Sequence, residues 1–126
     1  MILYVNACAR PDSRTDRLAR ALLQKLGPYE ELRLYDEPLR PMDAHRVALR
    51  DALLSQKDYG ADMFRYARQF AAAEQIVLSA PLWDLSFPAQ LKIYLENIFV
   101  TGIVTRYSEA GLPVGLCRAK KLYYVS

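Results

Sequence analysis

The sequence predicts an α/β protein: a doubly wound parallel β-sheet with helices on both of its faces. Short apolar runs at residues 1–7 and 75–80 are typical of strands buried on both faces, and longer helical patterns alternate with such runs along the chain. Strands that alternate with helices form parallel sheets through right-handed crossovers. A length of 126 residues suits one core, so we expect residues 1–126 to form a single domain.

The elements of the N-terminal half follow in order. Residues 1–7 form the first strand, and Ser13 or Thr15 caps a helix that runs to about Leu26. One face of this helix carries leucines four residues apart, at Leu18, Leu22 and Leu26. A Gly-Pro pair then ends the helix. Residues 31–35 alternate polar and apolar side chains, which predicts a strand near a sheet edge. A proline-bearing loop follows at residues 36–41.

In the C-terminal half, residues 45–73 are expected to be helical with a break near Tyr59 and Gly60. Residues 75–80 form a buried strand that ends at a proline, and Pro88 suits the first turn of a helix reaching about Val100. The glycine- and proline-bearing residues 101–118 are expected to be irregular, and residues 121–126 form the last strand.

Composition narrows the class of protein. With 52% hydrophobic and 25% charged residues, the chain is neither collagen-like nor disordered. No apolar run approaches the length of about 20 residues that a membrane span needs, and we expect a cytoplasmic protein. The two cysteines form no CxxC pair, and a lone His45 cannot anchor a metal set, so no metal is expected.

Charge indicates a small anion as ligand rather than a nucleic acid. The net charge is +3, and the only dense basic stretch is interrupted by two aspartates. A nucleic-acid binder usually gathers its basic residues into one uninterrupted patch. The stretch contains Arg10, Arg14, Arg17 and Arg20, with Asp12 and Asp16 between them.

The loop after the first strand has the residues of a phosphate site. It leads into a helix N-terminus, where unpaired N–H groups and the helix dipole favour anions. Ser13 and Thr15 add hydroxyl groups, while Arg10 and Arg14 add positive charge. Because the glycines of Walker A and dinucleotide loops are missing, one terminal phosphate fits better than a pyrophosphate. The alternative is a capped helix with a solvated basic face.

The loop after the third strand carries a solitary tryptophan, Trp83, within residues 79–88. An exposed Trp is costly unless something flat covers it, and the carboxyl ends of parallel strands lie at one sheet edge. Trp83 is therefore predicted to border a heterocycle near the phosphate. The alternative makes Trp83 and Phe87 ordinary core or interface aromatics.

A family resemblance rests on residues 80–116, which read APLWDLSFPAQLKIYLENIFVTGIVTRYSEAGLPVGL. This stretch resembles the FMN-dependent NADH-azoreductases and NAD(P)H–quinone reductases, which have a flavodoxin-like fold. In that family, Pro, an apolar residue, an aromatic residue and Asn or Asp precede a helix beginning near Gln-Leu-Lys. Residues 102–107 echo the family's Gly-Val-Thr-Phe-Arg-Tyr-like segment.

The resemblance implies FMN as the cofactor and NADH or NADPH as the reductant. It places Cys8, Ser13, Arg14 and Thr15 around the ribityl phosphate, and Arg10 adds a charge on electrostatic grounds. The isoalloxazine ring would contact the second loop through Pro81, Leu82, Trp83, Asp84 and Leu85. Tyr107 is a candidate substrate shelf, and no side chain is expected to be catalytic, because the cofactor carries the chemistry.

The resemblance also implies a homodimer with active sites near the subunit boundary. Residues 91–100, with Tyr94, Ile98 and Phe99, are the candidate interface.

Two departures from the family stand out. Cys8 replaces a serine that azoreductases usually carry. A fifth strand, a glycine-containing flavin loop and a terminal helix are expected to be missing from the 126 residues. The last strand would then be an open edge carrying Leu122, Tyr123 and Tyr124, which implies a shortened or incomplete chain or a partner that covers the edge.

The favoured function is transfer of hydride and electrons from NAD(P)H through FMN to a quinone, azo or other aromatic acceptor, in a ping-pong cycle. Three alternatives stay open: a flavodoxin-type electron carrier without NAD(P)H activity, a protein that kept the fold and lost the cofactor, and another mononucleotide-binding α/β enzyme. No segment distinguishes NADH from NADPH.

Overall fold

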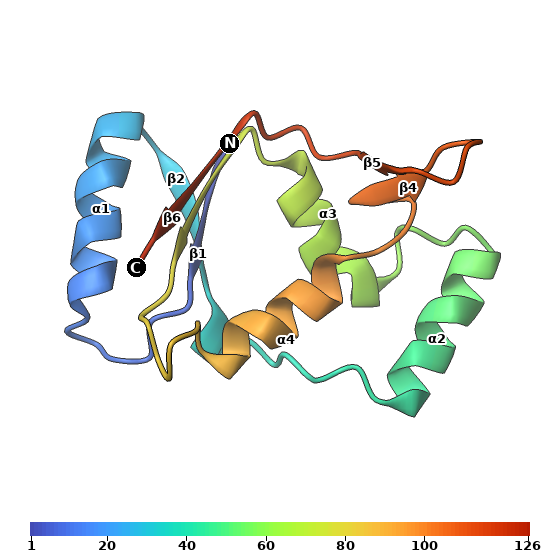
Figure 1. The fold of residues 1–126 in the computed structure, drawn as a ribbon, viewed down its shortest axis with the longest axis horizontal. Helices are drawn as coiled ribbons and strands as arrows, with labels where there is room; N and C mark the ends of the chain where they lie inside the picture. Colours follow the sequence, from blue (N-terminus) through green and yellow to red (C-terminus); the bar gives the residue numbers. More distant parts are fainter.

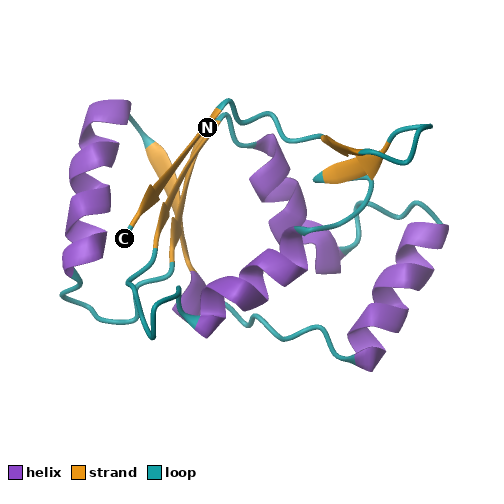
Figure 2. Ribbon diagram, in the orientation of Figure 1, coloured by secondary structure: helices purple, strands orange, loops and turns teal.

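A four-stranded parallel sheet forms the centre of the computed structural model, which describes all 126 residues (Figures 1 and 2). Its strand order is β2-β1-β3-β6, and every neighbouring pair is parallel. The strands are β1 (Ile2–Asn6), β2 (Tyr29–Arg33), β3 (Gln75–Ser79) and β6 (Lys121–Val125). Since helices cover both faces of this sheet, the predicted fold class is confirmed.

The helices take their positions from the strand order. The chain moves from β1 to β2 in one direction across the sheet, and then from β2 through β3 to β6 in the opposite direction. Right-handed crossovers therefore place α1 (Arg14–Leu26) on one face, and α3 (Arg65–Ala72) and α4 (Ala89–Ile98) on the other (Figure 1). The remaining helix, α2 (Ala44–Ser55), lies beyond α3 and α4 and buries no residue completely.

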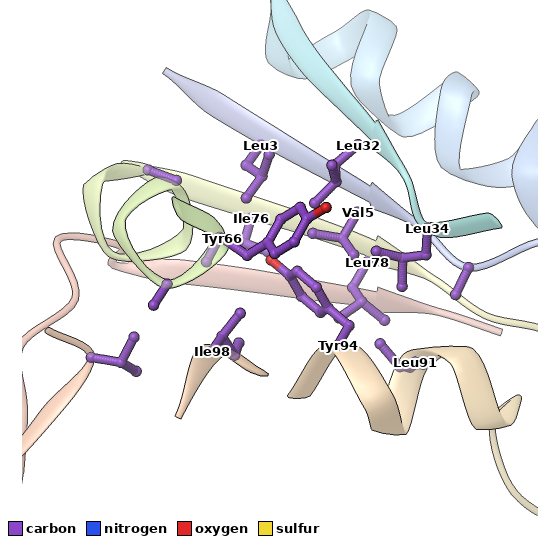
Figure 3. Packing of buried hydrophobic residues seen from close by; sticks show 14 of the residues in the cluster. Leu3, Val5, Leu32, Leu34, Tyr66, Ile76, Leu78, Leu91, Tyr94 and Ile98 are labelled. Atoms are coloured by element: carbon purple, nitrogen blue, oxygen red, sulfur yellow. The ribbon is translucent and has the colours of Figure 1, made fainter. Parts of the chain in front are cut away.

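The main core lies between the sheet and the pair α3 and α4 (Figure 3). Side chains of β1 alternate between the two faces, so that Leu3 and Val5 enter this core, while Ile2 and Tyr4 enter a smaller cluster under α1. Tyr94 and Ile98 of α4 are fully buried in the main core. Their predicted place at a subunit interface is wrong, because they pack against the chain's own sheet.

Two predicted segments differ in the structure. The strand expected at residues 31–35 lies at Tyr29–Arg33 and is followed by the 3-10 turn η1 (Leu34–Asp36). Pairing with the five residues of β1 ends at Arg33, and Leu34 turns into the core, where its carbonyl accepts a hydrogen bond from Gln90 Nε2 at 3.2 Å. The chain leaves the sheet there because β1 itself ends at Asn6, the partner of Arg33.

The segment at residues 101–118, expected to be irregular, contains an antiparallel hairpin of β4 (Thr105–Tyr107) and β5 (Pro113–Gly115). Its turn is closed by Ser108, whose N–H donates to Leu112 O and whose Oγ accepts from Leu112 N. Gly111, at a φ of 78°, supplies the left-handed residue of the turn. Gly111, one of the glycines for which this segment was expected to be irregular, instead forms part of a hairpin turn.

The other predicted boundaries agree within a few residues. Ser13, rather than Thr15, caps α1, and the predicted helical stretch at 45–73 divides into α2, the 3-10 turn η2 (Asp62–Phe64) and α3. The helix expected to reach Val100 ends at Ile98. At the sheet edge, β6 has one neighbouring strand and exposes about half of Leu122 and Tyr124. None of the helices has the length and apolar content needed to cross a membrane.

Candidate functional site

The strand order brings two loops together at one edge of the sheet. β1 and β3 are neighbours, and the connections that leave their carboxyl ends lead to opposite faces, to α1 and to α4 (Figure 1). Ligands of open α/β sheets bind outside such a reversal, because the diverging helices leave a crevice there. The loops at residues 7–13 and 80–88 border this crevice.

The first loop ends in a well-capped helix N-terminus. Ser13 Oγ accepts a hydrogen bond from Asp16 N at 3.2 Å, and Ser13 O accepts one from Arg17 N at 3.2 Å. The N–H groups of Arg14 and Thr15 precede the first possible helical hydrogen bond and have no intrahelical acceptor. They and the positive end of the helix dipole make this turn an anion site.

A buried polar network holds this turn against the sheet. Tyr4 Oη donates to Asp16 Oδ1 at 2.5 Å and lies 2.8 Å from Ser79 Oγ. Asn6 Nδ2 also reaches Asp16 Oδ1, at 3.3 Å, while Asn6 Oδ1 accepts a hydrogen bond from Cys8 N at 2.9 Å. Burial and then the hydrogen bond to Asp16 raise the pKa of Tyr4 above its ordinary value, so Tyr4 stays a neutral donor. Through Asp16, the network connects β1 and β3 to the first turn of α1.

A cavity of about 460 Å³ opens above the first turn of α1. Three arginines contribute positive charge to it, and one aspartate contributes negative charge. Pro81 and Trp83 from the second loop close it on the other side. Its lining consists of Ala9, Arg10, Asp12, Ser13, Arg14, Thr15, Arg17, Pro81 and Trp83. Net positive charge, hydroxyl groups and free backbone N–H groups suit a phosphate, and Trp83 suits a ring bonded to it.

Trp83 stands between this cavity and a second one of about 490 Å³. The second cavity is more apolar and extends over the start of α4; it is lined by Tyr35, Trp83, Asp84, Ser86, Phe87, Pro88, Ala89 and Gln90. Trp83 is 41% exposed, so it is not a core residue. An anion cradle that continues past an exposed Trp into an aromatic groove fits an aromatic mononucleotide such as FMN.

Comparison with known proteins agrees with this geometry. The family model described as having a flavodoxin-like fold matches residues 1–126. The chain belongs to this flavodoxin-like family. An FMN-dependent NADH:quinone oxidoreductase 2 from Clostridium acetobutylicum is 37% identical, over 98% of this chain and 65% of its own length. An FMN-dependent NADH:quinone oxidoreductase from Clostridium beijerinckii is 33% identical, over 99% of this chain and 67% of its own.

Solved structures show the same relationship. The crystal structure of an azoreductase from Bacillus anthracis superposes with a TM-score of 0.83 at 27% identity, covering 98% of this chain and 66% of that one. The resemblance to azoreductases and quinone reductases is therefore confirmed. This flavodoxin-like chain spans about two thirds of the length of the relatives it matches.

Most of the predicted site residues meet in the flavodoxin-like crevice. Arg10, Ser13, Arg14, Thr15, Pro81 and Trp83 line the first cavity. Asp84 lines the second. The juxtaposition of the two loops is as the sequence predicts, and the role of each residue toward a cofactor stays a prediction.

Four predicted residues lie outside both cavities. Cys8 is only 4% exposed, and its Sγ contacts Ser79 Oγ at 3.4 Å, so the thiol packs below the loop. Leu82 and Leu85 are exposed and line neither cavity. Tyr107 lies exposed on β4 and lines neither cavity.

Several lining residues were not predicted. Asp12 and Arg17 border the first cavity, and Tyr35 and Gln90 the second. The sequence could have predicted Tyr35 at the site, because Tyr35 follows the strand next to the first one and the carboxyl ends of all parallel strands share one edge. It could not have predicted Gln90, because the position of Gln90 depends on how α4 packs against η1.

Proposed function

We propose that this chain belongs to an FMN-dependent oxidoreductase that passes electrons from NAD(P)H to a quinone or azo acceptor. The observation that carries the proposal is that Trp83 lines both the basic cavity at the start of α1 and the more apolar cavity at the start of α4. The names of the relatives from two Clostridium species, FMN-dependent NADH:quinone oxidoreductases, support it. FMN would supply the redox chemistry, taking hydride from the nicotinamide and delivering electrons to the acceptor.

The chain's own residues have the task of binding and orienting. The N–H groups of Arg14 and Thr15, the hydroxyl groups of Ser13 and Thr15, and the guanidinium groups of Arg10 and Arg14 would hold the phosphate. Trp83 would pack against the flavin, and the backbone of residues 82–85 would follow the ring edge. Asp16 fixes the cradle through Tyr4 and Asn6.

A ping-pong order is part of this proposal, and the open shape of the site supports it. The groove beside Trp83 is open to solvent. One open face would serve the reductant and the acceptor in turn, and Tyr107 remains a candidate shelf for them. Parallel lines in double-reciprocal plots of initial rate against NADH at several quinone concentrations would support this order; intersecting lines would contradict it.

The experiment that tests the function is NADH oxidation by the FMN-loaded chain with a soluble quinone, followed at the absorbance of NADH. We expect steady-state turnover, weaker FMN retention in Trp83→Ala, and unchanged retention in the control variant Leu49→Ala, an exposed apolar residue on α2 outside both cavities. Retained FMN without NADH oxidation would favour an electron carrier instead. No FMN retention would favour a protein that kept the fold without the cofactor.

A homodimer and a cytoplasmic location are part of this proposal. With Tyr94 and Ile98 buried, Phe99 is the exposed aromatic residue of the predicted interface segment 91–100. Analytical ultracentrifugation of the wild type and of Phe99→Ala tests the dimer: a wild-type monomer would contradict it.

A further inference from the structure

A second basic cavity lies outside the crevice described above. It has a volume of about 200 Å³ and is formed by the loop between η1 and α2, the first turn of α2, the junction of η2 with α3, and the end of α4. Figure 1 shows this loop passing along α4 to reach α2. The cavity shares no lining residue with the two cavities at Trp83.

Positive charge dominates the lining of this cavity. Arg40, Arg46 and Arg65 all line it, and Asp62 is the single acidic residue that does. The side chain of Asp62 is 87% exposed and lies 3.6 Å from Arg65, so solvent screens much of its charge. The neighbouring Asp43 is already occupied, since it caps α2 by accepting the N–H of Arg46 at 2.9 Å.

Two of the guanidinium groups are held in place by neighbours. Arg46 Nη2 donates to Asn97 Oδ1 at 2.9 Å. Asn97 is itself buried and fixed, because its Nδ2 donates to Ile93 O at 2.8 Å and to Arg40 O at 3.1 Å. Arg65 stacks on the ring of Tyr66 and donates to its hydroxyl at 2.8 Å. The hydroxyl of Tyr66 in turn donates a hydrogen bond to Glu37 Oε1 at 3.0 Å, and Glu37 does not line the cavity.

Arg46 carries an unsatisfied donor: its Nε is buried and has no hydrogen-bond partner. Buried donors on charged groups almost always have an acceptor, because leaving one unpaired is costly. The three arginines around this cavity, one of them with an unpaired donor, carry more positive charge than the single aspartate beside them can balance. Asn97, Tyr66 and Asp43 position the arginines without neutralising all three.

We propose that this cavity binds a phosphoryl group, either free phosphate or the phosphate of a phosphomonoester. A phosphoryl dianion carries about −1.5 to −2 charges at neutral pH, which matches the excess of three arginines over one exposed aspartate better than a single carboxylate does. Guanidinium groups bind such oxyanions in bidentate geometry. A cavity of about 200 Å³ is large enough for a phosphate.

The test is a titration of the ¹⁵N-labelled chain followed by NMR at the Arg Nε–H and Asn97 side-chain amide signals. Inorganic phosphate and AMP are added separately, with adenosine and sodium chloride of equal ionic strength as controls. Saturable chemical-shift changes at Arg46, Arg65 and Asn97 are expected. Arg65→Gln should lower the affinity that these changes report roughly tenfold or more. Arg50→Gln, on the same helix as Arg46 but outside the cavity, should leave this affinity unchanged.

The arms of the titration separate the outcomes. Tighter binding of AMP than of phosphate would assign a phosphomonoester, and equal or weaker binding would assign free phosphate. Equal shifts with adenosine or sodium chloride, or shifts confined to residues 10–15, would overturn the proposal. Because the two sites give separate signals, a loss of FMN binding at residues 10–15 would leave this result standing.

Discussion

Trp83 and Ser86 exchange a reciprocal pair of backbone hydrogen bonds, with Trp83 N donating to Ser86 O at 2.7 Å and Ser86 N donating to Trp83 O at 2.8 Å. The two residues between them, Asp84 and Leu85, have φ angles of 51° and 65°. Two consecutive positive φ angles define a type I′ turn, which prefers Asn or Asp followed by Gly. Asp84 suits its position, and Leu85 does not.

Replacement of Leu85 by glycine should therefore stabilise the fold. A non-glycine residue in the left-handed region costs about 1–2 kcal/mol, and the side chain of Leu85 is 92% exposed, so almost no packing is lost. We expect Leu85→Gly to raise the free energy of unfolding by about 1 kcal/mol, measured by urea denaturation. The control Leu82→Gly, an exposed leucine outside the positive-φ pair, should be neutral or destabilising. Equal destabilisation by both changes would contradict the turn assignment.

Removal of the hydroxyl group should change the stability of the fold differently at two buried tyrosines. Tyr4 Oη bonds to Asp16 and lies within hydrogen-bond distance of Ser79, whereas Tyr94 Oη is buried without a partner. Tyr4→Phe should lower the free energy of unfolding by about 1–3 kcal/mol, because it leaves Asp16 with one donor fewer. Tyr94→Phe should be neutral or stabilising. Chemical denaturation measures both, and a larger loss in Tyr94→Phe would refute this hydrogen-bond assignment.

Acid should weaken the cap of α2. The hydrogen bond from Arg46 N to the carboxylate of Asp43, and then the charge of Arg40, lower the pKa of Asp43 below its ordinary value of 3.8. A carboxyl group with a lowered folded-state pKa stabilises the fold above its unfolded pKa, and loses this effect as the pH falls through the folded pKa. An NMR titration should show Asp43 ionising below pH 3.8. Asp43→Asn, which keeps the acceptor oxygen, should lose less stability between pH 5 and pH 2.

The architecture was largely predictable because its signals are local. The apolar run of β1 and the caps and stops of α1 lie in consecutive residues, and right-handed crossovers then determine the layers. Because parallel strands share one carboxyl edge, Arg14 and Trp83 could be placed near each other from the sequence alone.

The predictions that were wrong concern side chains whose positions depend on contacts between distant residues. Tyr94 could have faced a partner or the core, and only its packing under α3 decides that it is buried. Cys8 follows β1 in the predicted loop, but its orientation toward Ser79 depends on the pairing of β1 with β3. The sequence pattern within one segment does not predict these contacts.

The phosphate should account for much of the FMN affinity if the cradle at the start of α1 holds it. FMN and riboflavin differ only in this phosphate, so FMN should bind more tightly. Arg14→Gln should weaken FMN binding about tenfold and leave riboflavin unchanged. Lys25→Gln, at the other end of α1, is the matched control. Flavin fluorescence titrations measure the six affinities of the wild type and the two variants for the two flavins. An equal loss of affinity for both flavins in Arg14→Gln would show that Arg14 does not act through the phosphate.

The central claim is that this crevice holds an FMN that cycles between NAD(P)H and an acceptor. Its most direct test is the visible spectrum of the purified chain after incubation with FMN and removal of the excess. The account predicts a retained flavin spectrum that bleaches when NADH or NADPH is added without oxygen and returns when a quinone is added. A chain that retains no flavin, or a retained flavin that neither nucleotide reduces, would contradict it.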